Sequence, residues 1–200
     1  MRDGPVSASV LRRAVARVPH WCRVVMERDI DAQLRELPLA ELDAYEVSGR
    51  RREGLGFRSY QSTMYPAFDL CRTDEVAPVA DVVFCEQVLE HVRHPARAAR
   101  TLFRLTRPGG IAIVSVPFLI RLHREPEDYW RFSGAGLRAL LEDAGFTVER
   151  VESWGNRASV LLNMWFWFPY VPFVNSLRNS PSAPMVVWAV ARRPAGAGGG

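Results

Sequence analysis

Residues 81–118 constrain the fold more than any other stretch, because they read as strand, loop, helix and strand. Asp81–Cys85 is an apolar run rich in β-branched and aromatic residues, which is typical of a strand buried on both faces. Pro95 suits the first turn of the following helix, and the Pro-Gly-Gly turn at 108–110 is expected to end it. Ile111–Val116 is a second buried strand. Two such strands joined by a helix predict a right-handed unit with parallel strands.

Ligands of a parallel sheet bind outside the carboxyl ends of its strands. This rule nominates two loops: 86–91 after the first of these strands, and 117–132 after the second. Both loops are rich in ionisable and aromatic side chains. Functional residues are therefore expected in these two loops.

The sequence C-E-Q-V-L-E-H-V, followed by a helix and then R-P-G-G before the next strand, resembles the second half of class I S-adenosylmethionine-dependent methyltransferases. The resemblance covers Phe68–Phe146 and points to the type 11-like members. It implies an α/β, Rossmann-like fold with a doubly wound, mostly parallel sheet of seven strands or fewer. It also implies S-adenosyl-L-methionine as the cofactor.

The cofactor-binding half of that fold is abridged in this chain. Leu42–Val47 corresponds to the first strand, where the family usually carries an acidic residue followed by G-x-G; here Glu46 and Gly49 keep the acid and one glycine. The short run Phe57–Ser62 corresponds to the second strand, which in the family typically ends in an acid that holds the ribose hydroxyls. Gln61-Ser62 stands at that position, so other groups are expected to bind the ribose.

Five residues are expected to bind the cofactor by their positions in the resemblance. Asp69 matches an aspartate that accepts a hydrogen bond from the adenine amino group, and Glu86 and Gln87 follow the strand that faces the methionine part. Glu46 and Gly49 complete the set. Plainer interpretations stand beside these: Asp69 as a turn or helix-capping residue, and Glu86 and Gln87 as caps of the next helix.

The loop after the second strand carries the residues expected to act on the acceptor. His123 and Asp128 are predicted to be a general base and its orienting group, with Tyr129 beside them. Tyr129 and Trp130 are expected to form a wall for an apolar or ring-bearing acceptor. Arg131 would hold a carboxylate or phosphate by a two-pronged contact. Alternatively, the aromatic residues pack the loop and Arg131 pairs with one of its acids.

Two further motifs bear on the resemblance. H-x-x-P-x-D-Y-x-R at 123–131 and S-W-G-N-R at 153–157 resemble one subgroup of methyltransferase-like proteins. L-E-H at 89–91 occurs in family members with unlike substrates. This distribution favours a structural role for His91, hydrogen-bonded into its loop, over the role of a base.

Composition excludes several classes of function. The chain has 200 residues, of which 48% are hydrophobic and 24% charged, as expected for one globular domain. All 26 basic residues are Arg and they are interleaved with 22 acids, so no basic stripe for a nucleic acid is expected. The three cysteines are widely spaced and predict neither a metal site nor a disulfide framework. They favour a reducing, cytoplasmic compartment. We expect no bound metal.

The chain divides into an N-terminal helical cap (1–40), a methyltransferase-like domain (41–193) and a disordered tail (194–200). Met185–Ala191 is a final strand and fits the antiparallel strand that closes the family's sheet. The apolar segment 159–174 is too short for a transmembrane helix, which needs roughly 20 residues. Its aromatic part, Leu161–Phe173, packs on the sheet, covers an apolar acceptor or contacts a membrane surface.

The resemblance implies transfer of a methyl group to a small-molecule or lipid-linked acceptor. The main alternative is a catalytically inactive, methyltransferase-like binding module, because the glycine loop is reduced and the ribose acid is missing. The absence of G-x-G-x-x-G counts against a nicotinamide-dependent oxidoreductase. A peripheral membrane protein is a third alternative. The acceptor atom and the oligomeric state are left open by the sequence.

Overall fold

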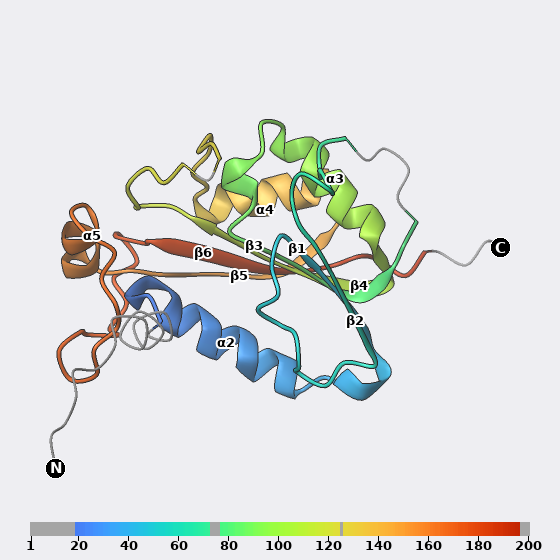
Figure 1. Cartoon of the computed structure of the whole chain (residues 1–200), viewed down its shortest axis with the longest axis horizontal. Helices are drawn as coiled ribbons and strands as arrows, with labels where there is room; N and C mark the ends of the chain where they lie inside the picture. The colour runs from blue at the N-terminus through green and yellow to red at the C-terminus, as the bar shows by residue number, and fades with distance from the viewer. Residues whose placement is uncertain (1–18, 73–76, 125, 197–200) are drawn as a thin grey trace, which may run out of the picture.

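Six strands form one sheet in the computed structural model, in the order β2-β1-β3-β4-β6-β5 (Figure 1). The structure describes residues 19–72, 77–124 and 126–196. The strands are β1 (Asp43–Val47), β2 (Ser59–Thr63), β3 (Ala80–Glu86), β4 (Thr106–Pro117), β5 (Thr147–Trp154) and β6 (Val186–Arg192). Strands β2, β1, β3 and β4 run parallel, and β6 runs antiparallel between β4 and β5. The predicted fold class, a mostly parallel α/β sheet, is confirmed.

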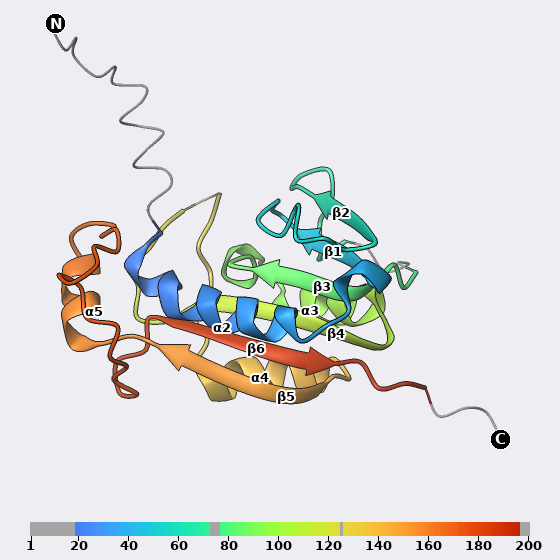
Figure 2. The same cartoon turned by 90° about the horizontal axis from the view of Figure 1, so that it is seen from below.

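Helices cover both faces of this sheet (Figures 1 and 2). Helices α3 and α4 lie on one face and α2 lies on the other, while α5 lies beyond one end of the sheet. The helices are α2 (Val24–Arg35), α3 (Pro95–Leu105), α4 (Gly134–Asp143) and α5 (Arg157–Asn163), with 3₁₀ turns η1 (Trp21–Arg23), η2 (Leu39–Glu41) and η3 (Leu89–His91). This two-sided cover is the doubly wound arrangement that the sequence predicted.

Each layer of helices forms its own apolar core with the sheet. Leu102 of α3 and Leu141 of α4 are fully buried on one face, and Ile30 of α2 on the other. Successive residues of β3 serve the two cores in turn, Val83 the first and Phe84 the second. Each such side chain stabilises the fold by about 1.5–3 kcal/mol. A central strand buried on both faces explains why its sequence is a continuous apolar run.

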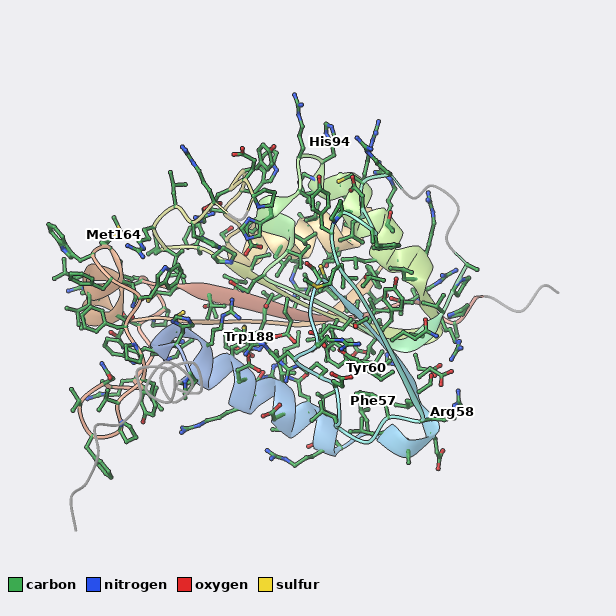
Figure 3. All side chains as sticks on the ribbon, in the orientation of Figure 1. Phe57, Arg58, Tyr60, His94, Met164 and Trp188 are labelled. Carbon is green, nitrogen blue, oxygen red and sulfur yellow. The ribbon has the colours of Figure 1, made fainter. Side chains whose placement is uncertain are left out.

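Polar contacts also fix α2 on the sheet. The indole of Trp188 in β6 donates a hydrogen bond of 2.7 Å to Asp29 of α2 (Figure 3). Arg150 of β5 pairs with the same carboxylate. The predicted N-terminal cap therefore includes a helix that packs on the sheet. The amphipathic residues predicted within 1–18, and 197–200 of the predicted tail, lie outside the described residues, so the division into domains stays a prediction.

The prediction that the Pro-Gly-Gly turn at 108–110 ends the helix was wrong. Helix α3 already ends at Leu105, and β4 begins at Thr106. Thr106 pairs with Ala80 of β3, so the strand begins directly after the last residue of the helix. The Pro-Gly-Gly sequence instead lies inside β4, where the register with β3 shifts and Gly109 adopts a φ of 82°.

Other sequence predictions for this half are confirmed. Ser133 caps α4, because its Oγ accepts a hydrogen bond of 3.1 Å from the N–H of Gly136. The final strand, predicted at 185–191, is β6 and closes the sheet in antiparallel orientation. The outer strand predicted at 146–151 is β5, which runs on to Trp154.

The S-W-G-N-R motif at 153–157 makes the corner between β5 and α5. The side chain of Asn156 accepts a hydrogen bond from the N–H of Ser159 (2.8 Å), and Ser159 Oγ accepts one from the N–H of Asn156 (3.0 Å). This reciprocal capping box starts α5. A Cβ atom at Gly155 would lie 2.1 Å from the backbone oxygen of Ala183. Glycine therefore allows the corner to approach the neighbouring backbone closely.

The substitution Gly155→Ala should destabilise the fold, because the clashing atom belongs to the backbone and cannot move aside at little cost. We expect the free energy of unfolding, measured by urea denaturation, to fall by about 1–3 kcal/mol. Gly136→Ala is the control: its Cβ would lie 3.5 Å from Ser133 Oγ inside α4. That change should be neutral or stabilising by up to about 1 kcal/mol. Equal stability of the two variants would contradict the role given to Gly155.

Candidate functional site

A cavity of about 570 Å³ opens at the carboxyl ends of β1 and β3. Val47 and Ser48 border it from β1, and Gln87 and Val88 from β3. Asp69, from the segment between β2 and β3, forms another part of the wall. The volume lies within the roughly 300–1,000 Å³ of small-molecule sites. Its position is the one expected for ligands of a parallel sheet.

Directly after each of these two strands, one residue at the cavity has a left-handed backbone conformation. Ser48 has a φ of 59° and Gln87 a φ of 56°, a region that residues other than glycine rarely adopt. Hydrogen bonds of 2.8 Å hold both residues in place, from Ser48 N–H to the carbonyl of Thr63 and from Gln87 N–H to the carbonyl of Ser115. Such conformations persist where the surroundings enforce them, and they cluster at functional sites.

The loop after β1 is organised by the buried carboxylate of Glu46. This carboxylate accepts hydrogen bonds from the N–H groups of Arg51 (2.9 Å) and Arg52 (2.8 Å) and from the hydroxyl of Tyr60 (2.7 Å). Burial and the nearby carboxylate raise the pKa of Tyr60. A Cβ at Gly49 would lie 2.4 Å from Glu46 Oε1. Glu46 and Gly49 therefore shape the loop together, and neither is among the residues that line the cavity.

The guanidinium of Arg52 is buried beside that loop and pairs with three carboxylates. It donates to both oxygens of Glu86 (2.7 and 3.0 Å), to Glu27 (2.8 Å) and to Asp31 (3.0 Å). Burial raises the pKa of Glu86, and the charge of Arg52 opposes that rise. Although burial disfavours its own charge, these carboxylates raise the pKa of Arg52 above its ordinary value. Glu86 thus points towards α2 and does not line the cavity.

Two of the five predicted cofactor residues, Asp69 and Gln87, do line the cavity. Oδ1 of Asp69 accepts a hydrogen bond of 2.8 Å from the N–H of Cys71, which fixes the carboxylate at the wall. The side-chain amide of Gln87 donates to Ser115 Oγ over 3.2 Å. The cavity therefore has room for an adenosyl group and an acceptor atom for its amino group. The residues present fit the nucleoside part of the cofactor that the resemblance implies.

The predicted base and orienter come together in the loop after β4. The N–H of His123 donates to Asp128 Oδ2 over 2.9 Å, and His123 Nδ1 lies 3.4 Å from the same oxygen. Arg131 makes a two-pronged contact with Asp128, so it pairs within the loop as the alternative interpretation held. Contacts with Glu90 and Asp128 raise the pKa of His123. His123 and Asp128 are not among the residues that line the cavity.

The two loops meet around Glu90. Its carbonyl oxygen accepts a hydrogen bond of 2.8 Å from the N–H of Tyr129, a residue that lines the cavity. Trp130 packs on the other loop as well, and its indole donates to the carbonyl of Val92 over 3.0 Å. His91 also lines the cavity and is hydrogen-bonded into the loop, since its Nδ1 lies 2.5 Å from the carbonyl oxygen of Glu127.

The aromatic segment Leu161–Phe173 lies beyond the end of the sheet and is mostly exposed. Trp165 and Phe166 are 72% and 67% exposed, and Met164 projects from the same end of the molecule (Figure 3). Trp167 points inward, and its ring packs edge-on against that of His123 with 5.7 Å between centroids. Over the described part of the chain, no helix is long and apolar enough to cross a membrane.

Comparison with known proteins gives a consistent result. Residues 20–151 match a family model described as a methyltransferase domain. The chain is 37% identical over 88 residues to the ubiquinone biosynthesis O-methyltransferase of Psychrobacter arcticus, a match that covers 36% of this chain and 34% of that protein. It is 39% identical over 75 residues to a probable S-adenosylmethionine-dependent methyltransferase of Mycolicibacterium smegmatis, covering 34% and 29%. The matches thus span about a third of the length of these relatives.

Solved structures share the fold. An S-adenosylmethionine-dependent methyltransferase from Mesorhizobium loti superposes with a TM-score of 0.51 at 16% identity. The match covers 82% of this chain and 96% of that one. At this identity the likeness concerns the arrangement of strands and helices.

Removal of the buried guanidinium should test the charge network beside the cavity. Arg52→Met leaves Glu86 buried without its partner, so the free energy of unfolding in urea should fall by about 3–5 kcal/mol. Arg51→Met is the matched control, because the Arg51 side chain is 47% exposed and pairs with Glu27 alone among the ion pairs of the described residues. It should cost at most about 1 kcal/mol. If Arg52→Met lowers the free energy of unfolding no more than Arg51→Met does, the network is not a source of stability.

Proposed function

The chain belongs to the methyltransferase domain family, and from this premise we propose that it transfers a methyl group from S-adenosyl-L-methionine to a small-molecule or lipid-linked acceptor. The cofactor supplies a methyl carbon that is already activated by its bond to a sulfonium. The protein must hold the acceptor atom in line with that carbon, and positioning supplies much of the rate. The observation that supports the proposal most is the cavity between Ser48 and Gln87, with its left-handed backbone on both sides.

In this proposal the wall residues bind the cofactor directly. The carboxylate of Asp69 accepts a hydrogen bond from the adenine amino group, and Gln87 lies beside the methionine part. Glu46, Gly49 and Glu86 support this wall from behind and do not line the cavity. Glu46 and Gly49 fix the loop after β1, and Glu86 fixes the end of β3 through its ion pair with Arg52.

The loop after β4 handles the acceptor. A hydroxyl or amine acceptor needs a base, and we assign this role to His123 with Asp128 as the orienting group. The raised pKa of His123 makes its neutral imidazole a better proton acceptor. Tyr129 would contact the acceptor, because it is one of the residues that line the cavity. Trp130 and Arg131 complete the acceptor side by bracing this loop.

The rim of the cavity favours an anionic acceptor. Arg93 and Arg97 line the cavity, as does Arg72, which pairs with Asp69 over 3.4 Å. An acceptor that carries a phosphate or carboxylate group would be attracted there. Both a small acid and a lipid-linked phosphate satisfy this condition.

The alternative function is a binding module without catalysis. The use of Glu46 within the loop favours this alternative, because that carboxylate already accepts three hydrogen bonds from the protein. The sequence of β2 also carries no acid for the ribose. Binding of the cofactor separates the two functions.

Calorimetric titration with S-adenosylhomocysteine should detect one site per chain. Asp69→Ala should weaken this binding by about tenfold or more, since a hydrogen bond to a charged group contributes roughly 1.5–3 kcal/mol. Asp143→Ala, an exposed acid of α4, serves as the control and should bind as the wild type does. Absence of binding at millimolar ligand would favour the module without catalysis.

His123→Ala should lower methyl transfer by more than tenfold while affinity for S-adenosylhomocysteine is unchanged, if His123 is the base. Transfer is measured with labelled cofactor and a cell extract as the source of acceptor. His94→Ala is the control, because it removes a histidine that lines the cavity but has no assigned role in transfer. Near-normal transfer by the His123 variant would remove His123 from the catalytic set.

A further inference from the structure

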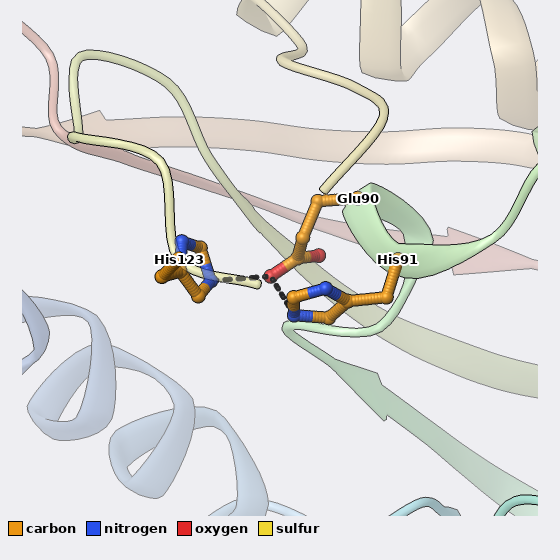
Figure 4. Close-up of side chains that lie close together, drawn as sticks. All are labelled: Glu90, His91 and His123. Atoms are coloured by element: carbon orange, nitrogen blue, oxygen red, sulfur yellow. Dashed lines mark ion pairs between the residues drawn. The ribbon is translucent and has the colours of Figure 1, made fainter. Parts of the chain in front are cut away.

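Three side chains from the two loops converge beside the cavity (Figure 4). Nε2 of His91 lies 3.6 Å from Glu90 Oε1, and Nε2 of His123 lies 3.8 Å from the same oxygen. The three atoms all lie within 4.8 Å of one another. Glu90 and His91 belong to η3 after β3, whereas His123 belongs to the loop after β4.

The carboxylate of Glu90 is wholly buried and lacks a hydrogen bond. Its exposure is 0%, and neither Oε1 nor Oε2 accepts a hydrogen bond from any residue that the structure describes. A buried carboxylate is unfavourable unless it is paired, hydrogen-bonded or bound to a metal. The two imidazole nitrogens at 3.6 and 3.8 Å are too far for hydrogen bonds. The site therefore offers a buried carboxylate that accepts no hydrogen bond, with an imidazole nitrogen at ion-pair distance on each side.

The far sides of both imidazole rings meet oxygen atoms. His91 Nδ1 lies 2.5 Å from the carbonyl oxygen of Glu127, which can only accept, so Nδ1 donates and Nε2 is the nitrogen turned towards Glu90. A carbonyl behind the ring in this way is a usual support of metal-binding histidines. His123 Nδ1 lies 3.4 Å from the carboxylate of Asp128 and, like the Glu90 oxygens, makes no hydrogen bond among the described residues.

From this geometry we propose that Glu90, His91 and His123 bind one divalent ion of the first transition series, such as Zn²⁺ or Fe²⁺. Two imidazole nitrogens and one carboxylate oxygen suit these ions better than Mg²⁺ or Ca²⁺, which prefer oxygen ligands. Ligand atoms about 2.0–2.1 Å from a tetrahedral Zn²⁺ are roughly 3.3 Å apart. The separations of 3.6 and 3.8 Å between Glu90 Oε1 and the two imidazole nitrogens would have to close by a few tenths of an ångström.

The ion would join the two loops that carry cavity residues. Tyr129 and Glu127 lie on one loop and His91 on the other, and all three line the cavity. Three protein ligands leave at least one coordination position for water or for an oxygen of a bound molecule. The ion and a proton compete for Nε2 of His123, so the metal-bound form has no free base at this position. Metal binding itself does not depend on methyl transfer, and it is tested separately.

The sequence predicted no metal, because the ligand search followed the cysteines. His123 lies far from Glu90-His91 along the chain, and parallel strands β3 and β4 bring their following loops together. The adjacent pair Glu90-His91 gives little signal without this third ligand.

The test is a titration of the full chain, after treatment with a chelator, with Zn²⁺ alone by calorimetry and with Co²⁺ by visible absorption. We expect one ion per chain, ligand-field bands of Co²⁺ bound to nitrogen and oxygen, and a higher melting temperature with Zn²⁺. Glu90→Gln and His123→Ala should each weaken Zn²⁺ binding by at least about 100-fold. This effect exceeds the one expected from loss of a residue that only orients a metal ligand. His94→Ala, which changes a histidine outside the cluster, should bind the ion as the wild type does.

A second measurement keeps the test independent of how the variants fold. Crystals of the wild-type chain soaked in Zn²⁺ should give an anomalous peak between Glu90, His91 and His123. Absence of binding by the wild type at submillimolar Zn²⁺, unchanged binding by both variants, or a peak elsewhere would overturn the proposal. The three residues would then form an ion pair between a carboxylate and a protonated histidine. These outcomes do not depend on whether S-adenosylhomocysteine binds.

Discussion

The buried guanidinium of Arg52 is the constraint on which the ligand-binding edge depends. It ties the loop after β1 to α2 through Glu27 and Asp31, and to the end of β3 through Glu86. A charge removed from water in this way is stable only while its partners remain in place. On the side that faces α2, the edge of the sheet is therefore occupied by the charged side chains of this network. The cavity opens on the other side, between Ser48 and Gln87.

The same network explains how an abridged half still forms a ligand site. Where the family carries G-x-G, the glycines let the backbone come close to the cofactor. This chain holds its loop through the carboxylate of Glu46 and the missing side chain of Gly49. Acids that the resemblance would place near the cofactor are used to support the backbone. In the proposed function, the direct contacts are made by Ser48, Asp69 and Gln87, which line the cavity.

Sequence reasoning predicted the strands and helices of the central unit well, because burial on both faces leaves an apolar pattern that local residues alone reveal. Asp69 and Gln87 lie at the cavity wall and His123 lies beside Asp128, while the roles given to these residues stay predictions. Arg52 was missed, since an arginine in a run of three gives no sign of burial. Its partners are two acids of α2 and Glu86 at the end of β3, which are far from it in sequence and are brought near by the fold. The cluster of Glu90, His91 and His123 combines residues of two loops, so their spacing along the sequence did not predict it either.

The most direct test of this account is a crystal structure of the chain with S-adenosylhomocysteine. The account predicts electron density for the ligand in the cavity, with its adenine amino group at Asp69 and its amino-acid end between Ser48 and Gln87. Glu46 and Arg52 should keep their present partners in that complex. Ligand bound at any other place, or bound only after Arg52 leaves Glu86, would contradict the account.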